Sequence, residues 1–312
     1  MQTKSDELAD ELAVALFEHM VLARAFDERL VELQRQGVVS QHASALGEEA
    51  TIVGAAAAMH DDDWVFPSSR EFAAALWRGM PLAGYAHHVL GSGRDVAHGR
   101  NAPDPPFWKA ARFVSVSPLA GNHIPHAVGV AWAARAAGHS IAALLFFGQG
   151  AAGSAEFHTG LNFAGVMAAP LVAVCRNDAR ASRLTASAGI AVKSLAYGLR
   201  GVRVDGSDVV AVYTAVRDAR ARAVAGEGGT LIEAVIDGKG GVEPADPVAK
   251  LRQHLEGRGL WDEARGQRLA TEVRADVERA IAEAIAAGPP ARETLSSGRD
   301  VFAADGDEGA VA

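Results

Sequence analysis

The 312-residue sequence contains a single cysteine, Cys175, so no disulfide can form within the chain. A lone thiol fits a reducing compartment, and we therefore expect a cytoplasmic protein. Long apolar runs are also missing, because no stretch approaches the ~20 residues needed to span a bilayer. The first residues, MQTKSDELADEL, are charged and acidic and do not predict a signal peptide. These absences argue against a secreted or membrane protein.

An excess of basic residues is absent as well. The chain has 30 Lys and Arg against 38 Asp and Glu, which gives a formal net charge of −8. Binding to a nucleic-acid backbone needs clustered Lys and Arg, so we expect no nucleic-acid partner. None of the 11 histidines pairs with cysteine at zinc-ligand spacing. His123 and His126 bracket Pro125, which argues against a helical pair of metal ligands.

Hydrophobic residues make up 49% of the chain, which is long enough to bury a full core. Short apolar runs alternate with helical patterns through its centre. Continuous apolar strands between helices are typical of a parallel sheet with helices on both faces, so we predict an α/β fold. The apolar runs lie at 141–147, 170–175, 199–204 and 229–236, and the predicted helices between them lie at 154–168, 188–198 and 207–226.

Further helices are predicted on either side of this α/β region. The N-terminal ones lie at 5–36 and 47–59, and the C-terminal ones at 246–256 and 261–287. Asp246-Pro247 fits an N-cap followed by the first helical position. Small residues at 47–59 and 127–138 indicate close helix contacts. We divide the chain into an α/β domain with N-terminal helices at 1–245, a C-terminal helical extension at 246–290 and a polar tail at 291–312.

The stretch LLFFGQGAAGSAEF, at 144–157, places glycines where an apolar strand ends. At this end of a parallel strand, main-chain N–H groups and the start of the next helix can hold an anion. Gly148 and Gly150 permit a ligand to approach the main chain closely. The turn is therefore a candidate site for an anionic cofactor.

Two interpretations of this turn remain open at this point. The spacing Gly148-x-Gly150-x-x-Gly153 matches a dinucleotide-binding fingerprint, with Asp178 as the acidic residue after the next strand. Alternatively, Gln149 and Asp178 ligate a magnesium ion that bridges a diphosphate. Magnesium prefers oxygen ligands, and both side chains supply one. The order Gly-polar-Gly, strand, Asn-polar resembles the thiamine diphosphate motif.

Longer stretches extend this resemblance over roughly 17–287. Each resembles the matching part of the alpha subunit of thiamine diphosphate-dependent 2-oxo acid dehydrogenases, the decarboxylase component of the pyruvate and branched-chain complexes. RFVSVSPLAGNHIP and CRND are most similar to the branched-chain type, with the pyruvate type next. The other stretches, in order, are MVLARAFDERLVELQRQG, ALGEEATIVGAAAAM, VFPSSREFAAALWRG, IPHAVGVAWA, FHTGLNFAGV, VRVDGSDVVAVYTAVRDARARA and DPVAKLRQHLEGRGLWDEA.

The resemblance implies a thiamine diphosphate-binding fold and an alpha subunit that binds thiamine diphosphate and Mg²⁺ beside a beta subunit, in a two-alpha, two-beta assembly. It implies oxidative decarboxylation of a 2-oxo acid and acyl transfer to a lipoyl-bearing acyltransferase. No catalytic residue of this chain is implied. The implied metal ligands are Gln149, Asp178 and the main-chain carbonyl of Arg180. The implied cofactor contacts are Arg70 and Arg176 to phosphate, Gly148, Gly150 and Ala151 along the diphosphate, and Leu119 and Ala120 near the pyrimidine.

The metal pair departs from the family pattern. Gln149 stands where the family has Asp or Glu, and Asp178 stands where it has Asn. One charge and two oxygens are retained by this exchange, so a magnesium site remains consistent with it.

Other departures affect the phosphate side. Ser69 and Phe72 replace a Tyr and a His of the family, and no histidine occurs between His158 and His254, where the family has a His-containing loop. The phosphate contact that this loop makes in the family would have to come from Lys239 or from the partner subunit. Three hypotheses follow: an active alpha subunit, a scaffold of the same fold with a degraded site, and an NAD-dependent Rossmann enzyme.

Overall fold

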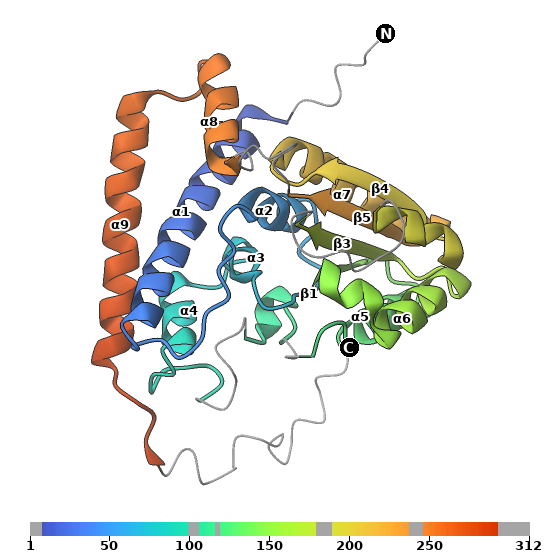
Figure 1. Cartoon of the computed structure of the whole chain (residues 1–312), viewed down its shortest axis with the longest axis horizontal. Coiled ribbons are helices and arrows are strands. Elements are labelled where there is room, and N and C mark those ends of the chain that lie inside the picture. The colour runs from blue at the N-terminus through green and yellow to red at the C-terminus, as the bar shows by residue number, and fades with distance from the viewer. Residues whose placement is uncertain (1–7, 99–105, 116–118, 179–188, 237–245, 293–312) are drawn as a thin grey trace.

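The computed structural model describes residues 8–98, 106–115, 119–178, 189–236 and 246–292. Its fold is α/β, with helices on both faces of a parallel sheet (Figure 1), which confirms the predicted class. Within these residues the sheet has five strands in the order β1-β2-β3-β5-β4. All neighbouring strands are parallel. The strands are β1 (Trp64–Phe66), β2 (Ala143–Gly148), β3 (Leu171–Asn177), β4 (Arg200–Asp205) and β5 (Thr230–Val235).

Helices flank the sheet and continue beyond it toward both ends of the chain (Figure 1). The α-helices of the described ranges are α1 (Asp10–Arg35), α2 (Glu49–Ala57), α3 (Phe72–Trp77), α4 (Leu82–Val89), α5 (Ile124–Ala136), α6 (Ala155–Val166), α7 (Val209–Arg222), α8 (Pro247–Gly257) and α9 (Glu263–Ala286). Shorter elements are the 3₁₀ helices η1 (Lys109–Ala111), η2 (Gln149–Gly153) and η3 (Ala191–Tyr197), and the π-helical turn η4 (Ala223–Glu227).

The central strands are buried on both faces. Successive side chains of a strand point to opposite sides, so each strand feeds two cores. Leu144 and Phe146 of β2 enter the core that also contains α2 and α7 residues. Leu145 and Phe147 enter the core on the side of α5 and α6. Cys175 of β3 is fully buried in this second core, and burial raises the pKa of its thiol, so it is an unreactive core residue.

The register of the sheet brings the ends of β2 and β3 level with each other. Gly148, the last residue of β2, pairs with Arg176, one residue before β3 ends at Asn177. Gln149 and Asp178 therefore follow directly after two adjacent strands. Because the carboxyl ends of parallel strands share one edge of a sheet, the topology brings these two residues together, as the sequence predicts.

The C-terminal helices pack against the N-terminal ones. α9 lies beside α1 and also contacts α4, while α8 contacts α1 and α2 (Figure 1). Phe17 of α1 and Trp261, just before α9, pack edge to face with 4.7 Å between ring centroids. Asp246 caps α8 by accepting a 3.0 Å bond from the main-chain N–H of Val248, with Pro247 at the first position. The predicted cap is confirmed.

The structure differs from the sequence prediction at β1, η3 and β4, and it adds the short helices α3 and α4, which were not predicted. β1 was not predicted, because three residues are too few to show a period. The predicted helix at 188–198 is the 3₁₀ helix η3, whose C-cap is Gly198 with a φ of 67°. β4 lies at the sheet edge with alternate residues exposed, unlike the buried strand expected at 199–204. The predicted domain boundaries remain predictions, since 237–245 and most of the tail lie outside the described residues.

Within the ranges that the structure describes, no helix combines the length and apolarity needed to cross a membrane.

The small residues of α2 permit a close helix contact within the chain. A Cβ on Gly54 would lie 3.1 Å from Val209 Cγ2 of α7. In the same way, a Cβ on Gly160 of α6 would lie 2.9 Å from Ile124 Cγ2 of α5. The first approach is tighter than most Cβ contacts and the second is closer than real Cβ atoms show, so glycine permits close helix packing within the chain at these two positions.

Gly165 of α6 lies so close to η3 that a Cβ added to it would be 1.7 Å from the carbonyl oxygen of Tyr197. We expect Gly165→Ala to lower the free energy of unfolding by about 3 kcal/mol, since main-chain atoms of η3 must move. Gly129→Ala, in α5 with no atom within 4 Å of the new Cβ, is the matched control and should raise it by about 0.5–1 kcal/mol. Urea unfolding followed by circular dichroism measures both. Equal effects of the two substitutions would contradict the packing described for α6.

Candidate functional site

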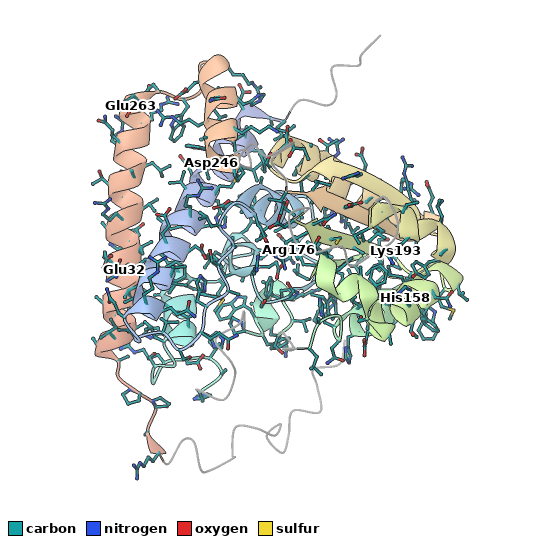
Figure 2. The ribbon with its side chains drawn as sticks, viewed as in Figure 1. Glu32, His158, Arg176, Lys193, Asp246 and Glu263 are labelled. Atoms are coloured by element: carbon teal, nitrogen blue, oxygen red, sulfur yellow. The ribbon has the colours of Figure 1, made fainter. Side chains whose placement is uncertain are left out.

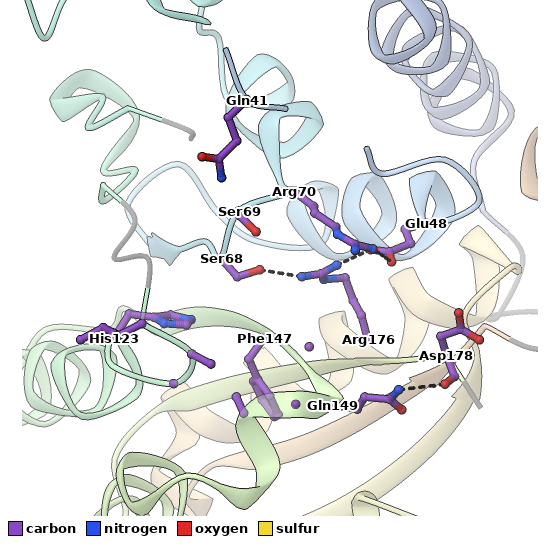
Figure 3. A pocket seen from close by; sticks show the side chains of 16 residues that line it. Gln41, Glu48, Ser68, Ser69, Arg70, His123, Phe147, Gln149, Arg176 and Asp178 are labelled. Carbon is purple, nitrogen blue, oxygen red and sulfur yellow. Dashed lines mark hydrogen bonds and ion pairs between the residues drawn. The ribbon is translucent and has the colours of Figure 1, made fainter. Parts of the chain in front are cut away.

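A pocket of about 450 Å³ opens at the carboxyl ends of β2 and β3 (Figure 3). Its walls come from these strand ends, from η2, from the loop after β1 and from segments preceding α2 and α5. All the predicted site residues line it except Arg180, which lies outside the described residues. The lining residues are Gln41, Glu48, Ser68, Ser69, Arg70, Leu119, Ala120, Gly121, His123, Phe147, Gly148, Gln149, Gly150, Ala151, Arg176 and Asp178.

The glycine turn leaves open space beside the main chain. A Cβ added to Gly148 or Gly150 would meet no heavy atom within 4 Å. The turn continues as the 3₁₀ helix η2, and α6 starts only at Ala155, where the Ser154 side chain accepts a 3.1 Å bond from the Phe157 N–H. A ligand in this space would therefore contact the main chain of the turn before the first residues of α6.

The two predicted metal ligands, Gln149 and Asp178, are adjacent, but their side-chain oxygens do not point toward a common position. The Gln149 Nε2 donates a 2.9 Å hydrogen bond to the main-chain oxygen of Asp178. Figure 3 shows the Asp178 carboxylate directed away from this amide group. Among the described residues, no group of three or more His, Cys, Asp and Glu could hold a metal ion. A cation shared by the two side chains would require the Asp178 side chain to turn.

Arg176 lines the pocket at the end of β3 and is only 7% exposed (Figure 2). Its guanidinium donates to the Glu48 carboxylate and, over 2.6 Å, to the Ser68 hydroxyl. Its Nε lies 2.8 Å from Glu71 Oε1, an ion pair whose angle is poor for a hydrogen bond. Burial alone would lower the pKa of Arg176, but the two carboxylates raise it above its usual range, so the group stays charged.

Glu71 fixes the loop that carries Arg70. Its fully buried carboxylate accepts bonds from the Ser68 N–H at 2.7 Å, the Ser68 hydroxyl at 3.0 Å and the Arg70 N–H at 3.2 Å. The Arg70 side chain, 43% exposed, pairs with Glu48 Oε1 at 2.7 Å. Both predicted phosphate-binding arginines, Arg70 and Arg176, are therefore paired with the carboxylate of Glu48.

His123 is a buried histidine in the pocket wall. Its Nε2 donates over 2.6 Å to the carbonyl oxygen of Phe146. Burial lowers the pKa of His123, although that hydrogen bond and the charge of Glu71 oppose the shift. The ring is thus neutral near pH 7, and its buried Nδ1 has no hydrogen-bond partner among the described residues. This nitrogen is an acceptor for a donor group on a ligand or water.

Sequence reasoning missed Gln41, Glu48, Ser68 and His123, all of which line the pocket. One signal was present, because Ser68 and Glu71 have the S-x-x-E spacing of a capping box. The 2.7 Å bond from the Ser68 N–H to the Glu71 carboxylate is the contact that this motif predicts. Nothing in the sequence distinguishes His123 from an exposed histidine.

The comparisons with known proteins agree on one family. The sequence model of the dehydrogenase E1 component family matches residues 17–236, which include every pocket residue. The 2-oxoisovalerate dehydrogenase subunit alpha 1, mitochondrial, of Arabidopsis thaliana is 34% identical over 298 residues, covering 88% of this chain and 63% of that protein. The 2-oxoisovalerate dehydrogenase subunit alpha, mitochondrial, of Bos taurus is 34% identical, and the match covers 90% of this chain and 67% of that protein. The pyruvate dehydrogenase E1 component subunit alpha of Staphylococcus aureus is 33% identical, with 89% and 79% covered. The chain thus spans less than two thirds of the plant relative.

His123 should make folding sensitive to acid. Its folded-state pKa is lowered from 6.5, so the unfolded chain binds the extra proton; stability is kept above about pH 6.5 and is lost as the pH falls below it. We expect His123→Gln to reduce the fall in melting temperature between about pH 7.5 and about pH 5. His126→Gln, on the exposed side of α5, controls for the loss of one imidazole. An equal change in both variants would contradict the burial argument.

Proposed function

Because the chain belongs to the dehydrogenase E1 component family, we propose that it acts as the alpha subunit of a 2-oxo acid dehydrogenase and binds thiamine diphosphate in this pocket. One observation carries the proposal. Apart from Arg180, which lies outside the described residues, the residues chosen from sequence for the diphosphate and the metal are spread from Arg70 to Asp178 and line a single cavity.

The donor groups of the pocket suit a diphosphate. The Arg70 and Arg176 guanidinium groups can each donate two parallel bonds to phosphate oxygens. The open side of Gly148 and Gly150 gives phosphate access to the main chain at the strand end, where parallel sheets commonly bind anions. Ser69 adds a hydroxyl donor at the opposite wall, while the Ser68 hydroxyl already donates to the Glu71 carboxylate. This set fits a phosphate ligand better than it fits an apolar one.

Magnesium belongs to the proposal as a cation that would offset part of the diphosphate charge. Gln149, Asp178 and the main-chain carbonyl of Arg180 would hold it, all through the oxygen atoms that magnesium prefers. Turning the Asp178 carboxylate toward the Gln149 amide would bring two of these oxygens together.

Thiamine diphosphate, when bound, would supply the decarboxylation chemistry as an electron sink. This chain's residues bind and orient the diphosphate end. A beta subunit completes the site, and a lipoyl-bearing acyltransferase receives the acyl group. The names of the relatives favour a branched-chain 2-oxo acid, with pyruvate as the alternative. We place the protein in the cytoplasm.

A second candidate is a scaffold that assembles with a beta subunit without turnover. The missing histidine between His158 and His254, the Ser69 and Phe72 replacements and the exchanged metal pair favour it. The segment 237–245, which includes Lys239, lies outside the described residues. The two candidates differ in turnover, and both retain the same fold.

The metal assignment is tested by titrating the full chain with thiamine diphosphate in a calorimeter, with and without Mg²⁺. We expect Mg²⁺ to strengthen binding to the wild type, and Asp178→Ala to remove at least about tenfold of that gain, since a charged oxygen ligand is lost. Asp218→Ala, an exposed carboxylate on α7, is the control for charge. Undiminished metal dependence in Asp178→Ala would show that the ligand assignment is wrong.

Turnover separates the active subunit from the scaffold. For the chain co-purified with a beta-type subunit, we expect release of CO₂ from a 2-oxo acid that depends on thiamine diphosphate. Arg70→Met should raise the cofactor concentration for half-maximal rate by about tenfold or more, because a charged phosphate contact is lost, while excess cofactor restores the rate. Cofactor binding without CO₂ release from branched-chain 2-oxo acids or pyruvate would favour the scaffold.

A further inference from the structure

The two arginines of the proposed phosphate site are already bound to a carboxylate of the same chain. Glu48 places Oε1 2.7 Å from Arg70 Nη1, and its Oε2 accepts from Arg176 Nη1 (Figure 3). Glu48 stands at the start of α2 and its side chain is only 11% exposed. Its carboxylate lines the pocket and occupies guanidinium groups to which a phosphate would bind.

The charges that line the described part of the pocket cancel. Glu48 and Asp178 are negative, Arg70 and Arg176 are positive, and burial keeps His123 neutral by lowering its pKa. A diphosphate carries several negative charges, and like charges a few ångströms apart repel strongly where water is scarce. A free diphosphate would therefore meet a lining with no net positive charge, backed by the buried Glu71 carboxylate beside Arg176, and would compete with Glu48 for both arginines.

The two arginines depend on Glu48 to different degrees. Arg176 keeps the Ser68 hydroxyl and the Glu71 carboxylate as partners if Glu48 is removed. Among the described residues, the ion pair of the more exposed Arg70 is with Glu48 alone. Loss of the Glu48 charge would thus free Arg70 for a ligand while Arg176 stays in place.

We propose that Glu48 is an internal counter-anion of the phosphate-binding arginines, and that its charge makes diphosphate binding depend on a divalent cation. The proposal rests on the proposed function. In the cofactor-free protein Glu48 holds the two guanidinium groups together. A diphosphate enters with its cation, whose charge offsets the repulsion from Glu48 and Asp178, and it takes over the Arg70 contact.

The test uses inorganic pyrophosphate as the probe and the full-length chain, titrated calorimetrically with and without Mg²⁺. Glu48→Gln keeps the side-chain length and one carbonyl oxygen but removes the charge. We expect this variant to bind metal-free pyrophosphate at least about tenfold more tightly than the wild type, so the gain from Mg²⁺ shrinks by a similar factor. Glu49→Gln is the matched control, because Glu49 pairs with Arg24 and does not line the pocket. Circular dichroism melts check that each variant is folded.

The outcomes separate the inference from the function on which it rests. Equal or weaker metal-free binding by Glu48→Gln, with Mg²⁺-dependent binding by the wild type, would show that Glu48 only supports the arginines, and the inference would be wrong while the diphosphate site stands. If Glu49→Gln tightened metal-free pyrophosphate binding as much as Glu48→Gln, the effect would come from the overall charge of the protein, and the inference would also be wrong. If neither the wild type nor Glu48→Gln binds pyrophosphate under any condition, both the site and the inference fail.

Discussion

The buried guanidinium of Arg176 connects the sheet to the loops that form the pocket. It extends from the end of β3 and contacts Glu48 before α2, Ser68 after β1 and the buried Glu71. A charge removed from water is costly unless it is paired and hydrogen-bonded, and here the two carboxylates and a hydroxyl meet that need. Because the three partners come from segments far from β3 in sequence, this one group holds the walls of the pocket in register. The shape of the site therefore depends on a charge cluster as much as on the apolar cores beneath it.

The parts of the fold that the sequence predicts are those in which burial imposes a pattern. β2, β3 and β5 are covered on both faces, and complete burial yields the continuous apolar runs that identified them. β1 has three residues and was not predicted, whereas the strand predicted at 199–204 is β4, although β4 lies exposed at the edge. η3 was predicted as an α-helix because its composition is helical. Its end packs tightly on α6, where Gly165 has no side chain and so admits the Tyr197 carbonyl.

The same distinction applies within the site. Gln149 and Asp178 could be placed from sequence because each follows a strand, and parallel strands end at one edge. Glu48 and His123 come from segments whose position relative to the strand ends is decided by helix packing. Their roles depend on burial and on their neighbours, and the sequence alone does not distinguish a buried glutamate or histidine from an exposed one. The spacing of Ser68 and Glu71 predicts their local hydrogen bond. The ion pair between Glu71 and Arg176 is a tertiary contact, and this spacing does not predict it.

Charge balance gives the exchanged metal pair a physical meaning. With Gln149 neutral and Asp178 charged, the negative charge of the proposed metal pair lies at the end of β3, whereas the resemblance would place it at the end of β2, and the pair still has one carboxylate. Glu48 adds a second carboxylate, and the two arginines bring the lining to neutrality. A neutral pocket favours a ligand whose own charge is partly cancelled, and a diphosphate bound to a divalent cation is such a ligand. The Gln149 and Asp178 exchange is therefore compatible with a working site, provided that the cation and the diphosphate bind as one unit.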